Sequence, residues 1–343
     1  MNSNTYMEIT WVYSGYNWDP ADKGIKGSEQ AVVHLSEQFV KKGFKVTVYA
    51  FVPPQDLNGV SYKCMDTFNC EATYNILILC REGILVLLRG RRPKARIVLS
   101  DLHDDVSSDE TPNFVTYVDQ FMFKSKYHLS RFQHLSLSED NYFICPNGLQ
   151  LQNFTGPTET REPLRFCYTS SYDRGLEQLL QWSWPEIHKQ LPGSTLHVYY
   201  GWSPWHDPQE KGRIEILMNQ AGVIHHGKVS NAEIIAEKYR SSMNLYPCHS
   251  TTEIDCINMR ESALAECIPV LSDQNVCLER DGVHVPGNPR EKPFHDLYVK
   301  TVVDLFHDTK RQNELRKKFK LSPLLFGWEY VADQWMSVIT RSP

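Results

Sequence analysis

The amino-acid sequence predicts an α/β protein of two domains, each a doubly wound parallel sheet with helices on both faces. Three observations lead to this prediction. Short apolar runs alternate with segments of helical periodicity. The alternation stops at a polar, Gly- and Pro-containing stretch over residues 150–162 and then starts again. A chain of 343 residues is also long enough for two domains of ordinary size.

The first half opens with a strand at residues 7–13, followed by a loop rich in Gly, Asp and Pro. A helix begins at Ser28, because apolar residues recur at helical spacing up to Phe39, and Gly43 marks its end. The run NILILC at residues 75–80 is apolar throughout, as expected of a strand buried on both faces. Further strands are predicted at residues 45–52, 96–100 and 142–145.

The second half starts after the turn Pro146-Asn147-Gly148 and repeats the same alternation. Strands are predicted at residues 164–169, 195–201, 223–225, 243–246 and 269–271. Helices are predicted at residues 175–190 and 213–220, and the chain from residue 296 onward is expected to be helical. Two such units normally enclose a cleft, and their ligands bind at the carboxyl ends of the strands.

Composition excludes several classes of protein. The net charge is −5, which argues against a general nucleic-acid-binding role. No apolar run reaches the ~20 residues of a transmembrane helix, and the first residues lack the basic region and apolar core of a secretory signal. The nine cysteines are scattered and form no CxxC pair, which favours a reducing, cytoplasmic location and argues against a zinc site.

Gly27 lies between the first predicted strand and the first predicted helix. A glycine there lets the backbone approach a ligand closely, and the helix N-terminus offers N–H groups to an anion. A structural helix capped by Ser28 explains the same residues equally well. No GxGxxG fingerprint is present, which argues against a dinucleotide-dependent oxidoreductase.

The acidic segment from Ser100 to Asp105 directly follows a predicted strand. His103, with carboxylates around it, could bind a metal, act as a base or hydrogen-bond a polyol. An acidic loop with an incidental histidine is the alternative. One histidine among aspartates is weak evidence for a metal site, so we expect no bound metal.

Two segments of the second half carry the strongest signals. Ser170, Ser171 and Arg174 follow a strand, and their hydroxyl and guanidinium groups suit a diphosphate, although a solvated turn has the same composition. Glu253 and Glu261 are separated by seven residues, with a helix expected to start near Cys256. The N-terminus of this helix can face a phosphate, with a carboxylate on each side for hydroxyl groups. An ordinary amphipathic helix with a surface glutamate is the alternative.

In this order, the segments resemble GT-B glycosyltransferases of the retaining family 4 type, also called glycosyl transferases group 1. The E-x7-E motif of that family is matched by Glu253 and Glu261, and its inter-domain turn by Pro146-Asn147-Gly148. The stretch from Tyr168 to Trp202 resembles the opening of the second domain in members of the family, and GVIHHGKVSNAEI resembles the loop that holds the nucleobase.

The resemblance implies a GT-B fold in which two Rossmann-like domains face a cleft. It implies an acceptor domain over residues 1–150, a nucleotide-sugar domain over 151–325, and a C-terminal helix over 326–343 that packs back on the first domain. It implies catalytic roles for His103, Glu253 and Arg174. It also implies that the donor is held by Gly27, Ser170, Ser171, Arg174, His226, Gly227, Lys228, Glu253, Ile254, Asp255, Cys256, Ile257 and Glu261.

Within that set, the resemblance implies that His103 reaches the donor sugar, Glu253 holds sugar hydroxyls and Glu261 holds the ribose. Two departures from the family pattern affect the phosphate contacts. The family often has a separate Arg and Lys for the diphosphate, whereas Ser170 and Ser171 replace the earlier basic residue here. The first glycine loop often reads Gly-Gly, whereas Gly27 follows a lysine here.

The expected function is transfer of a sugar, with retention of configuration, from a UDP- or GDP-sugar to a hydroxyl of a glycan or glycoconjugate. No cofactor and no essential metal are expected, nucleic acid is not expected as a partner, and peripheral membrane contact is compatible with the sequence. A nucleotide-sugar epimerase of the same fold is one alternative, and a catalytically silent nucleotide-sugar-binding module is another. A metal-dependent transferase using Asp101 to Asp105 is the third.

Overall fold

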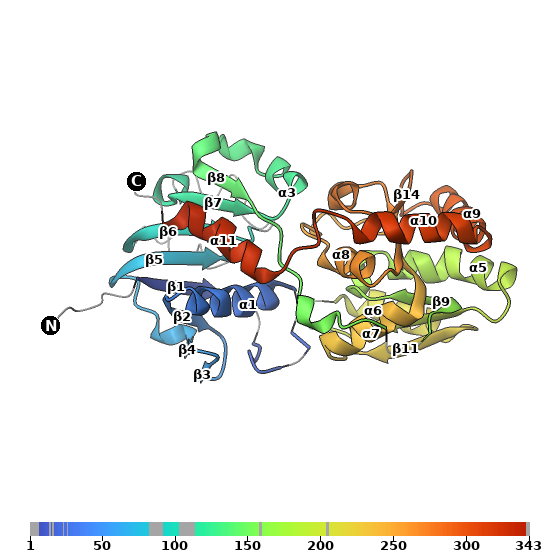
Figure 1. Ribbon diagram of the computed structural model, residues 1–343, viewed down its shortest axis with the longest axis horizontal. Coiled ribbons are helices and arrows are strands. Elements are labelled where there is room, and N and C mark those ends of the chain that lie inside the picture. Colours follow the sequence, from blue (N-terminus) through green and yellow to red (C-terminus); the bar gives the residue numbers. More distant parts are fainter. Residues whose placement is uncertain are drawn as a thin grey trace. The chain divides into compact units, whose positions relative to one another are not determined.

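The computed structural model describes residues 7–340, apart from residues 14, 16, 23, 26, 82–91, 103–113, 158–159 and 204–205. The chain divides into two compact units (Figure 1). Unit 1 contains Met1–Gly148 together with Gly327–Pro343, and unit 2 contains Leu149–Phe326. The chain therefore passes from one unit to the other twice.

Unit 1 is built on an eight-stranded sheet in the order β3-β4-β2-β1-β5-β6-β7-β8 within the described residues. Only β3 and β4 pair antiparallel there, and the other neighbours are parallel. The strands are β1 (Glu8–Tyr13), β2 (Lys45–Ala50), β3 (Gln55–Leu57), β4 (Val60–Cys64), β5 (Thr73–Cys80), β6 (Lys94–Ser100), β7 (Gln120–Phe123) and β8 (Tyr142–Ile144). The helices are α1 (Gly27–Lys41), α3 (Lys126–Ser130) and α11 (Trp328–Ile339).

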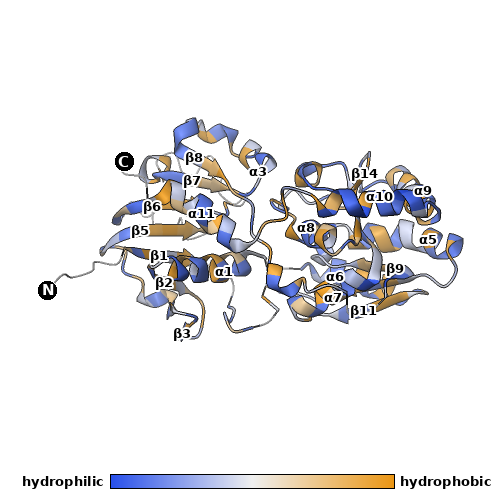
Figure 2. Cartoon of the chain, viewed as in Figure 1, coloured by the Kyte–Doolittle hydropathy of each residue, from blue (hydrophilic) through white to orange (hydrophobic). Residues whose placement is uncertain are grey.

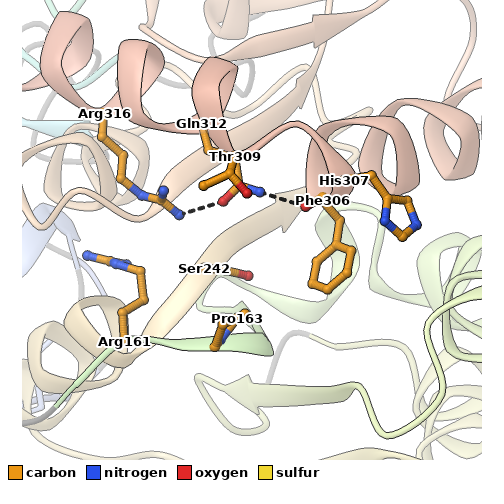
Figure 3. A pocket seen from close by; sticks show the side chains of 8 residues that line it. All are labelled: Arg161, Pro163, Ser242, Phe306, His307, Thr309, Gln312 and Arg316. Carbon is orange, nitrogen blue, oxygen red and sulfur yellow. Dashed lines mark hydrogen bonds between the residues drawn. The ribbon is translucent and has the colours of Figure 1, made fainter.

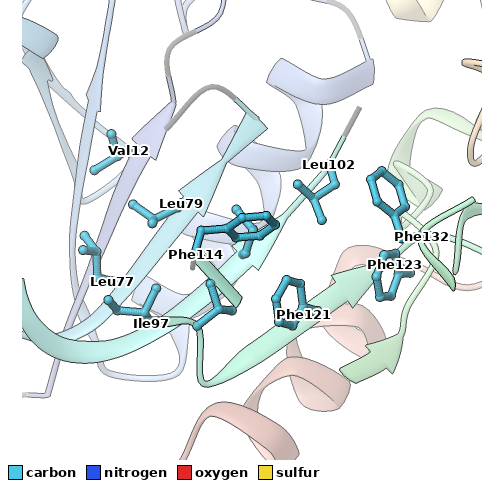
Figure 4. Close-up of a cluster of buried hydrophobic side chains, with 11 residues drawn as sticks. Val12, Leu77, Leu79, Ile97, Leu102, Phe114, Phe121, Phe123 and Phe132 are labelled. Atoms are coloured by element: carbon cyan, nitrogen blue, oxygen red, sulfur yellow. The ribbon is translucent and has the colours of Figure 1, made fainter. Parts of the chain in front are cut away.

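The central strands of unit 1 are buried on both faces. Residues Ile76–Cys80 of β5 are all buried, which agrees with the continuous apolar run in the sequence. Side chains alternate between the faces, so Leu77 and Leu79 belong to one core. That core also contains Val12, Ile97, Leu99 and six phenylalanine, valine and leucine side chains that follow β6 (Figure 4).

The opposite face of this sheet is covered by α1 and α11. Trp335 of α11 packs its ring against Trp11, Phe39 and Phe143, with ring centroids 5.7, 6.2 and 5.4 Å apart. Asp333 of the same helix forms an ion pair with Lys42, just beyond α1. Helix α11 is thus part of the core of unit 1.

Unit 2 has a six-stranded, all-parallel sheet in the order β11-β10-β9-β12-β13-β14 within the described residues. Its strands are β9 (Glu162–Tyr168), β10 (Thr195–Tyr199), β11 (Val223–Gly227), β12 (Ser241–Tyr246), β13 (Ile268–Ser272) and β14 (Val283–Val285). Its helices are α4 (Leu176–Gln178), α5 (Trp184–Gln190), α6 (Pro208–Leu217), α7 (Asn231–Arg240), α8 (Ile257–Leu264), α9 (Lys292–His307) and α10 (Thr309–Lys320). The apolar residues concentrate on the strands, whereas α10 is mostly hydrophilic (Figure 2).

The structure departs from the sequence expectations in four places. The antiparallel pair β3–β4 and the strands β7 and β14, which have three to five residues each, are not among the predicted strands. The helix expected over residues 175–190 is interrupted by a π-helical turn at Leu179–Ser183. Pro185 explains the interruption, because it has no N–H to donate to the carbonyl four residues earlier. None of the described helices is long and apolar enough to cross a membrane.

Candidate nucleotide-sugar site

The candidate site lies at the carboxyl edge of the unit 2 sheet. Because the strands are parallel, the loops after β9, β10, β11 and β12 all leave from this one edge. Every candidate residue that the sequence indicated in the second half belongs to one of these loops, to the end of β11 or to helix α8. The edge therefore brings together residues that are up to about ninety positions apart in the chain, from Ser170 to Glu261.

Arg174 and Glu253 form an ion pair that joins the loop after β9 to the loop after β12. Burial acts to lower the pKa of the Arg174 guanidinium, but the Glu253 carboxylate reverses this effect and raises it. The Nε atom of Arg174 is buried and has no hydrogen-bond partner among the described residues. This cation is consequently fixed in place by Glu253 while one of its N–H donors is left for another acceptor.

The Glu253 carboxylate is held at both oxygens. Its Oε2 accepts a hydrogen bond from the Tyr246 hydroxyl at 2.8 Å, in addition to the Arg174 contact. Its Oε1 accepts from the backbone N–H of Cys256 at 2.9 Å. The carboxylate is thus oriented by three donors from three segments, which is the rigidity that a substrate-positioning group requires.

The close approach of the two loops depends on Gly175. Its φ is +109°, and a Cβ built on it would lie 2.2 Å from the carbonyl oxygen of Pro247. An L side chain is therefore excluded twice, by the backbone conformation and by the loop after β12. Gly175 accordingly positions Arg174 directly beside the loop that leads to Glu253.

Helix α8 begins at this edge after an unusual cap. Cys256 adopts the left-handed conformation with φ 57° and ψ 49°, and its N–H is already taken by Glu253. The N–H groups of the first helical residues, Ile257 and Asn258, have no carbonyl within the helix to donate to. They form the positive end of α8, beside the Arg174–Glu253 pair.

The Asp255 side chain is buried in ion pairs rather than exposed to solvent. Its Oδ1 lies 3.2 Å from Nη1 of Arg260 and 3.0 Å from Nη2 of Arg280, and all three side chains are buried. These ion pairs anchor the turn between Glu253 and α8. The expectation that Asp255 and its neighbour Ile254 meet the donor through their backbone is unaffected by this side-chain arrangement.

Glu261 lies in α8 and pairs with Lys238 of α7, with Nζ 2.5 Å from Oε2. The Lys238 side chain is completely buried, and its ammonium also donates to the carbonyl oxygen of Asn258 at 3.1 Å. The second carboxylate oxygen, Oε1, accepts no hydrogen bond from the described residues. Glu261 is therefore fixed by one oxygen and has the other available.

His226, near the end of β11, is held by ring stacking and a hydrogen bond to side chains of the neighbouring strand β10. Its ring stacks on Tyr199 with centroids 4.3 Å apart, and its Nε2 lies 2.9 Å from Nδ1 of His197. Burial lowers the pKa of His226, and burial also lowers that of His197, to about 4. Both imidazoles are neutral at pH 7, so His226 presents a flat, uncharged ring. Gly227, with φ +70°, and Lys228 follow it at the end of β11.

The serine residues after β9 are buried and hydrogen-bonded. Ser170 donates to the Tyr246 hydroxyl at 3.2 Å, and Ser171 lies 3.3 Å from Nε2 of His206. Asp173 faces the same histidine, and although burial acts to raise its pKa, bonds to His206 and Ser171 and the charge of Arg174 lower it to about 2. The serines belong to the same edge as Arg174, as the sequence predicted.

In unit 1, the corresponding edge contains Gly27 at the start of α1. A Cβ on Gly27 would meet nothing within 4 Å, so packing does not account for this glycine. Its neighbour Ser28 accepts a hydrogen bond from Arg81 at 2.7 Å. His103 lies outside the described residues, so its expected role stays a prediction.

The metal-dependent alternative used Asp101 to Asp105. Asp101 forms a buried ion pair with Lys124 at 3.1 Å, which neutralises its charge, and residues 103–105 of that segment lie outside the described residues. Across the part of the chain that the structure describes, no three His, Cys, Asp or Glu side chains are grouped as metal ligands. That the reaction needs no metal ion stays a prediction, which a transfer assay in the presence of EDTA can test.

Comparison with solved structures identifies the class of fold. HepE of Anabaena, in complex with UDP-glucose, superimposes with a TM-score of 0.73 at 11% identity, covering 98% of this chain and 100% of HepE. Sucrose-phosphate synthase of Thermosynechococcus elongatus gives 0.70 at 14% identity over 96% and 98%. The catalytic domain of starch synthase IV of Arabidopsis thaliana, bound to ADP and acarbose, gives 0.69 at 10% identity over 98% and 99%. The chain therefore has the GT-B fold of these glycosyltransferases, as the sequence predicted.

At these identities the likeness establishes the fold alone. No protein-family model matches the chain. No curated protein matches it either.

Sequence reasoning missed several residues that build the site. Lys238 and Tyr246 hold the two glutamates, and His206 contacts Ser171 and Asp173. Tyr246 ends a predicted strand, so its place at the ligand edge could have been inferred. Nothing in the sequence distinguishes Lys238 from a surface lysine, because the helix around it also carries Glu233, Glu237 and Arg240.

Proposed function

We propose that this protein is a retaining glycosyltransferase that moves a sugar from a nucleoside-diphosphate sugar to an acceptor hydroxyl without a metal ion. The observation that carries the proposal is the Arg174–Glu253 pair beside the N-terminus of α8. A carboxylate suited to sugar hydroxyls and two sources of positive charge suited to a diphosphate occur together at the ligand-binding edge of a GT-B unit.

In the proposed reaction, the bond between the anomeric carbon and the diphosphate oxygen breaks, and a bond from that carbon to the acceptor oxygen forms on the same face. The departing diphosphate takes up the proton of the acceptor hydroxyl. Arg174 and the first N–H groups of α8 stabilise the negative charge that develops on the diphosphate, which is commonly a large contribution to catalysis. The unsatisfied Nε of Arg174 suits a phosphate oxygen.

In this proposal, Glu253 and Glu261 bind two different parts of the donor, the sugar and the ribose. Glu253 orients the sugar through its hydroxyls, and the available Oε1 of Glu261 accepts from the ribose. His226, Gly227 and Lys228 lie at the end of β11, where the nucleobase would sit, and the flat neutral ring of His226 is suited to a base edge. HepE is in complex with UDP-glucose, which makes a UDP-sugar the first donor to test, with GDP-sugars second.

The experiment begins with a thermal-shift screen of nucleoside diphosphates and nucleotide-sugars, since a ligand of the folded state raises its stability. The best donor is then assayed for transfer with wild type and Glu253→Gln. We expect the variant to lose roughly 10²–10³-fold in rate. Glu215→Gln is the matched control, because Glu215 is on α6 with about half of its side chain exposed. Equal rates for Glu253→Gln and wild type would refute the assignment.

Three further readouts separate this proposal from its alternatives. NMR of the product gives the anomeric configuration, which must equal that of the donor. Incubation without acceptor detects epimerisation, and a donor that binds without any turnover identifies a silent module. We expect EDTA to leave the rate unchanged, and we expect His103→Ala to lower turnover far more than nucleotide affinity. Loss of activity in EDTA would instead support the metal-dependent alternative.

A further inference from the structure

A cavity of about 430 Å³ lies in unit 2 beneath helices α9 and α10 (Figure 3). Pro163 and Ser242 line it from the beginnings of β9 and β12. The start of a parallel strand is at the opposite edge of the sheet from its carboxyl end, so this cavity is separate from the candidate donor site. Its volume is within the range of small-molecule sites.

Two guanidinium groups meet at one side of this cavity. Arg161 approaches from the linker before β9 and Arg316 from α10 (Figure 3). Burial lowers the pKa of Arg316, and the positive charge of Arg161 lowers it further, which is the effect of two like charges close together. Placing two cations side by side costs free energy unless an anion offsets it.

No carboxylate of the described residues forms an ion pair with either arginine. Arg161 donates to the carbonyl oxygens of Lys238, Ser241 and Ala265, and Arg316 donates to the carbonyl of Glu266 at 3.1 Å and to Gln312 at 3.0 Å. The Glu266 carboxylate pairs with Lys320 instead. The neighbours of the two arginines thus supply only neutral acceptors.

These bonds leave donors for a ligand. A guanidinium has five N–H groups, so the contacts above leave two on Arg161 and three on Arg316. Thr309, an exposed residue in the first turn of α10, adds a hydroxyl. The end of that helix is already capped by the Asp308 carboxylate, so the positive charge of the cavity comes from the two arginines. Phe306 forms an apolar wall on another side.

We propose that this cavity binds a small phosphate monoester, with the phosphate between Arg161 and Arg316 and the rest of the molecule against Thr309 and Phe306. Planar guanidiniums match phosphate oxygens in geometry as well as charge. The volume exceeds what inorganic phosphate alone needs, which favours an ester over the free ion. This inference does not rest on the proposed function, because it concerns the opposite edge of the sheet.

The test is isothermal titration calorimetry of the full chain with glucose 6-phosphate, inorganic phosphate and glucose as probes. We expect saturable binding of glucose 6-phosphate, weaker binding of inorganic phosphate and none of glucose. Arg316→Gln should weaken binding at least tenfold, since a charged hydrogen-bonded contact is removed. The Thr309 side chain forms no hydrogen bond with the described residues, so Thr309→Val should leave the melting temperature unchanged. We expect this variant to weaken binding of glucose 6-phosphate several-fold.

Two controls keep the result interpretable. Arg174→Met removes the cation of the candidate donor site and should leave binding of glucose 6-phosphate unchanged. Lys300→Met removes an exposed charge of α9 and should do the same. Absence of saturable binding in wild type would overturn the proposal. Loss of binding in Arg174→Met but not in Arg316→Gln or Thr309→Val would also overturn it, because the probe would then occupy the donor edge.

Discussion

The ammonium of Lys238 and the carboxylate of Glu261 form an ion pair that joins α7 to α8, with the lysine side chain wholly inside the protein. A buried ion of this kind is tolerated only while its partner is present. The pair therefore makes the second glutamate of the E-x7-E motif a structural as well as a binding element. The consequences for stability and for nucleotide affinity are separable by mutation.

Lys238→Met tests the structural part. The variant leaves Glu261 without its cation, and breaking a buried pair from one side typically costs about 3–5 kcal/mol. We expect chemical denaturation to show a loss of that order in the free energy of unfolding. Lys189→Met is the control, because Lys189 is exposed and its pair with Glu186 spans 3.6 Å, so its loss should be within about 0.5 kcal/mol. Similar effects in both variants would contradict the interpretation.

Glu261→Gln tests the binding part, because it keeps the length and shape of the side chain. It also leaves Lys238 without its anion, so its nucleotide affinity is compared with that of Lys238→Met, which breaks the same pair from the other side. We expect nucleoside diphosphate affinity to fall by on the order of 1–3 kcal/mol, because charged hydrogen bonds to the ribose are lost. Calorimetry with the nucleotide preferred by wild type is the measurement. Unchanged affinity would show that Glu261 does not contact the nucleotide and acts only through Lys238.

Alanine substitutions at two glycines, Gly175 and Gly212, are expected to change the stability of the protein in opposite directions. Gly175→Ala forces a methyl group onto the Pro247 carbonyl at a positive φ, and we expect a loss of roughly 2–4 kcal/mol in stability. Gly212 is inside α6 with nothing within 4 Å of its Cβ position. Gly212→Ala should stabilise by about 0.5–1 kcal/mol, as helix propensity dictates. Thermal unfolding of both variants decides whether the clash is real.

His197 makes folding stability depend on pH in a defined window. Its pKa is about 4 in the folded protein against 6.5 for the free side chain, first because of burial. Between these values the unfolded chain binds more protons, so stability rises with pH and falls on acidification from pH 6.5 to 4. We expect this residue to contribute on the order of 1–2 kcal/mol after solvent screening.

The check is the melting temperature of wild type and His197→Asn from pH 7 to pH 4. The asparagine can accept the hydrogen bond that Arg165 donates to His197. We expect the curve of the variant to be flatter, and identical slopes would exclude His197 as a source of the pH dependence. Burial also lowers the pKa of other histidines, which keeps part of the slope in both proteins; these are His225, His226, His249 and His295.

The sequence was informative where local patterns decide structure. Both sheets followed from the alternation of apolar runs and helical periodicity, because strands buried on two faces have no polar residues to obscure them. The hairpin β3–β4 was missed although Asn58-Gly59 is a typical turn dipeptide and both residues have positive φ. Its strands have three and five residues, and β3 lies at the edge of the sheet, so neither strand carries the long apolar run on which the other predictions depend.

The site was predicted in its composition but not in its pairings. Arg174 and Glu253 are expected from the sequence to hold different parts of one donor, and no local pattern indicates that they contact each other. That contact depends on the close packing of two loops at Gly175, and local sequence patterns do not encode such tertiary packing. The role of Lys238 could not be predicted for the same reason, because this residue is buried only when α7 packs on α8.

The placement of Trp335 has a consequence for how the chain is made. Trp11, Phe39 and Phe143 are synthesised long before the tryptophan that packs against all three. During translation, unit 2 emerges complete from the ribosome while the sheet of unit 1 still exposes the apolar face that α11 covers. A nascent chain of this protein must therefore keep that face from aggregating until α11 has been synthesised and can cover it.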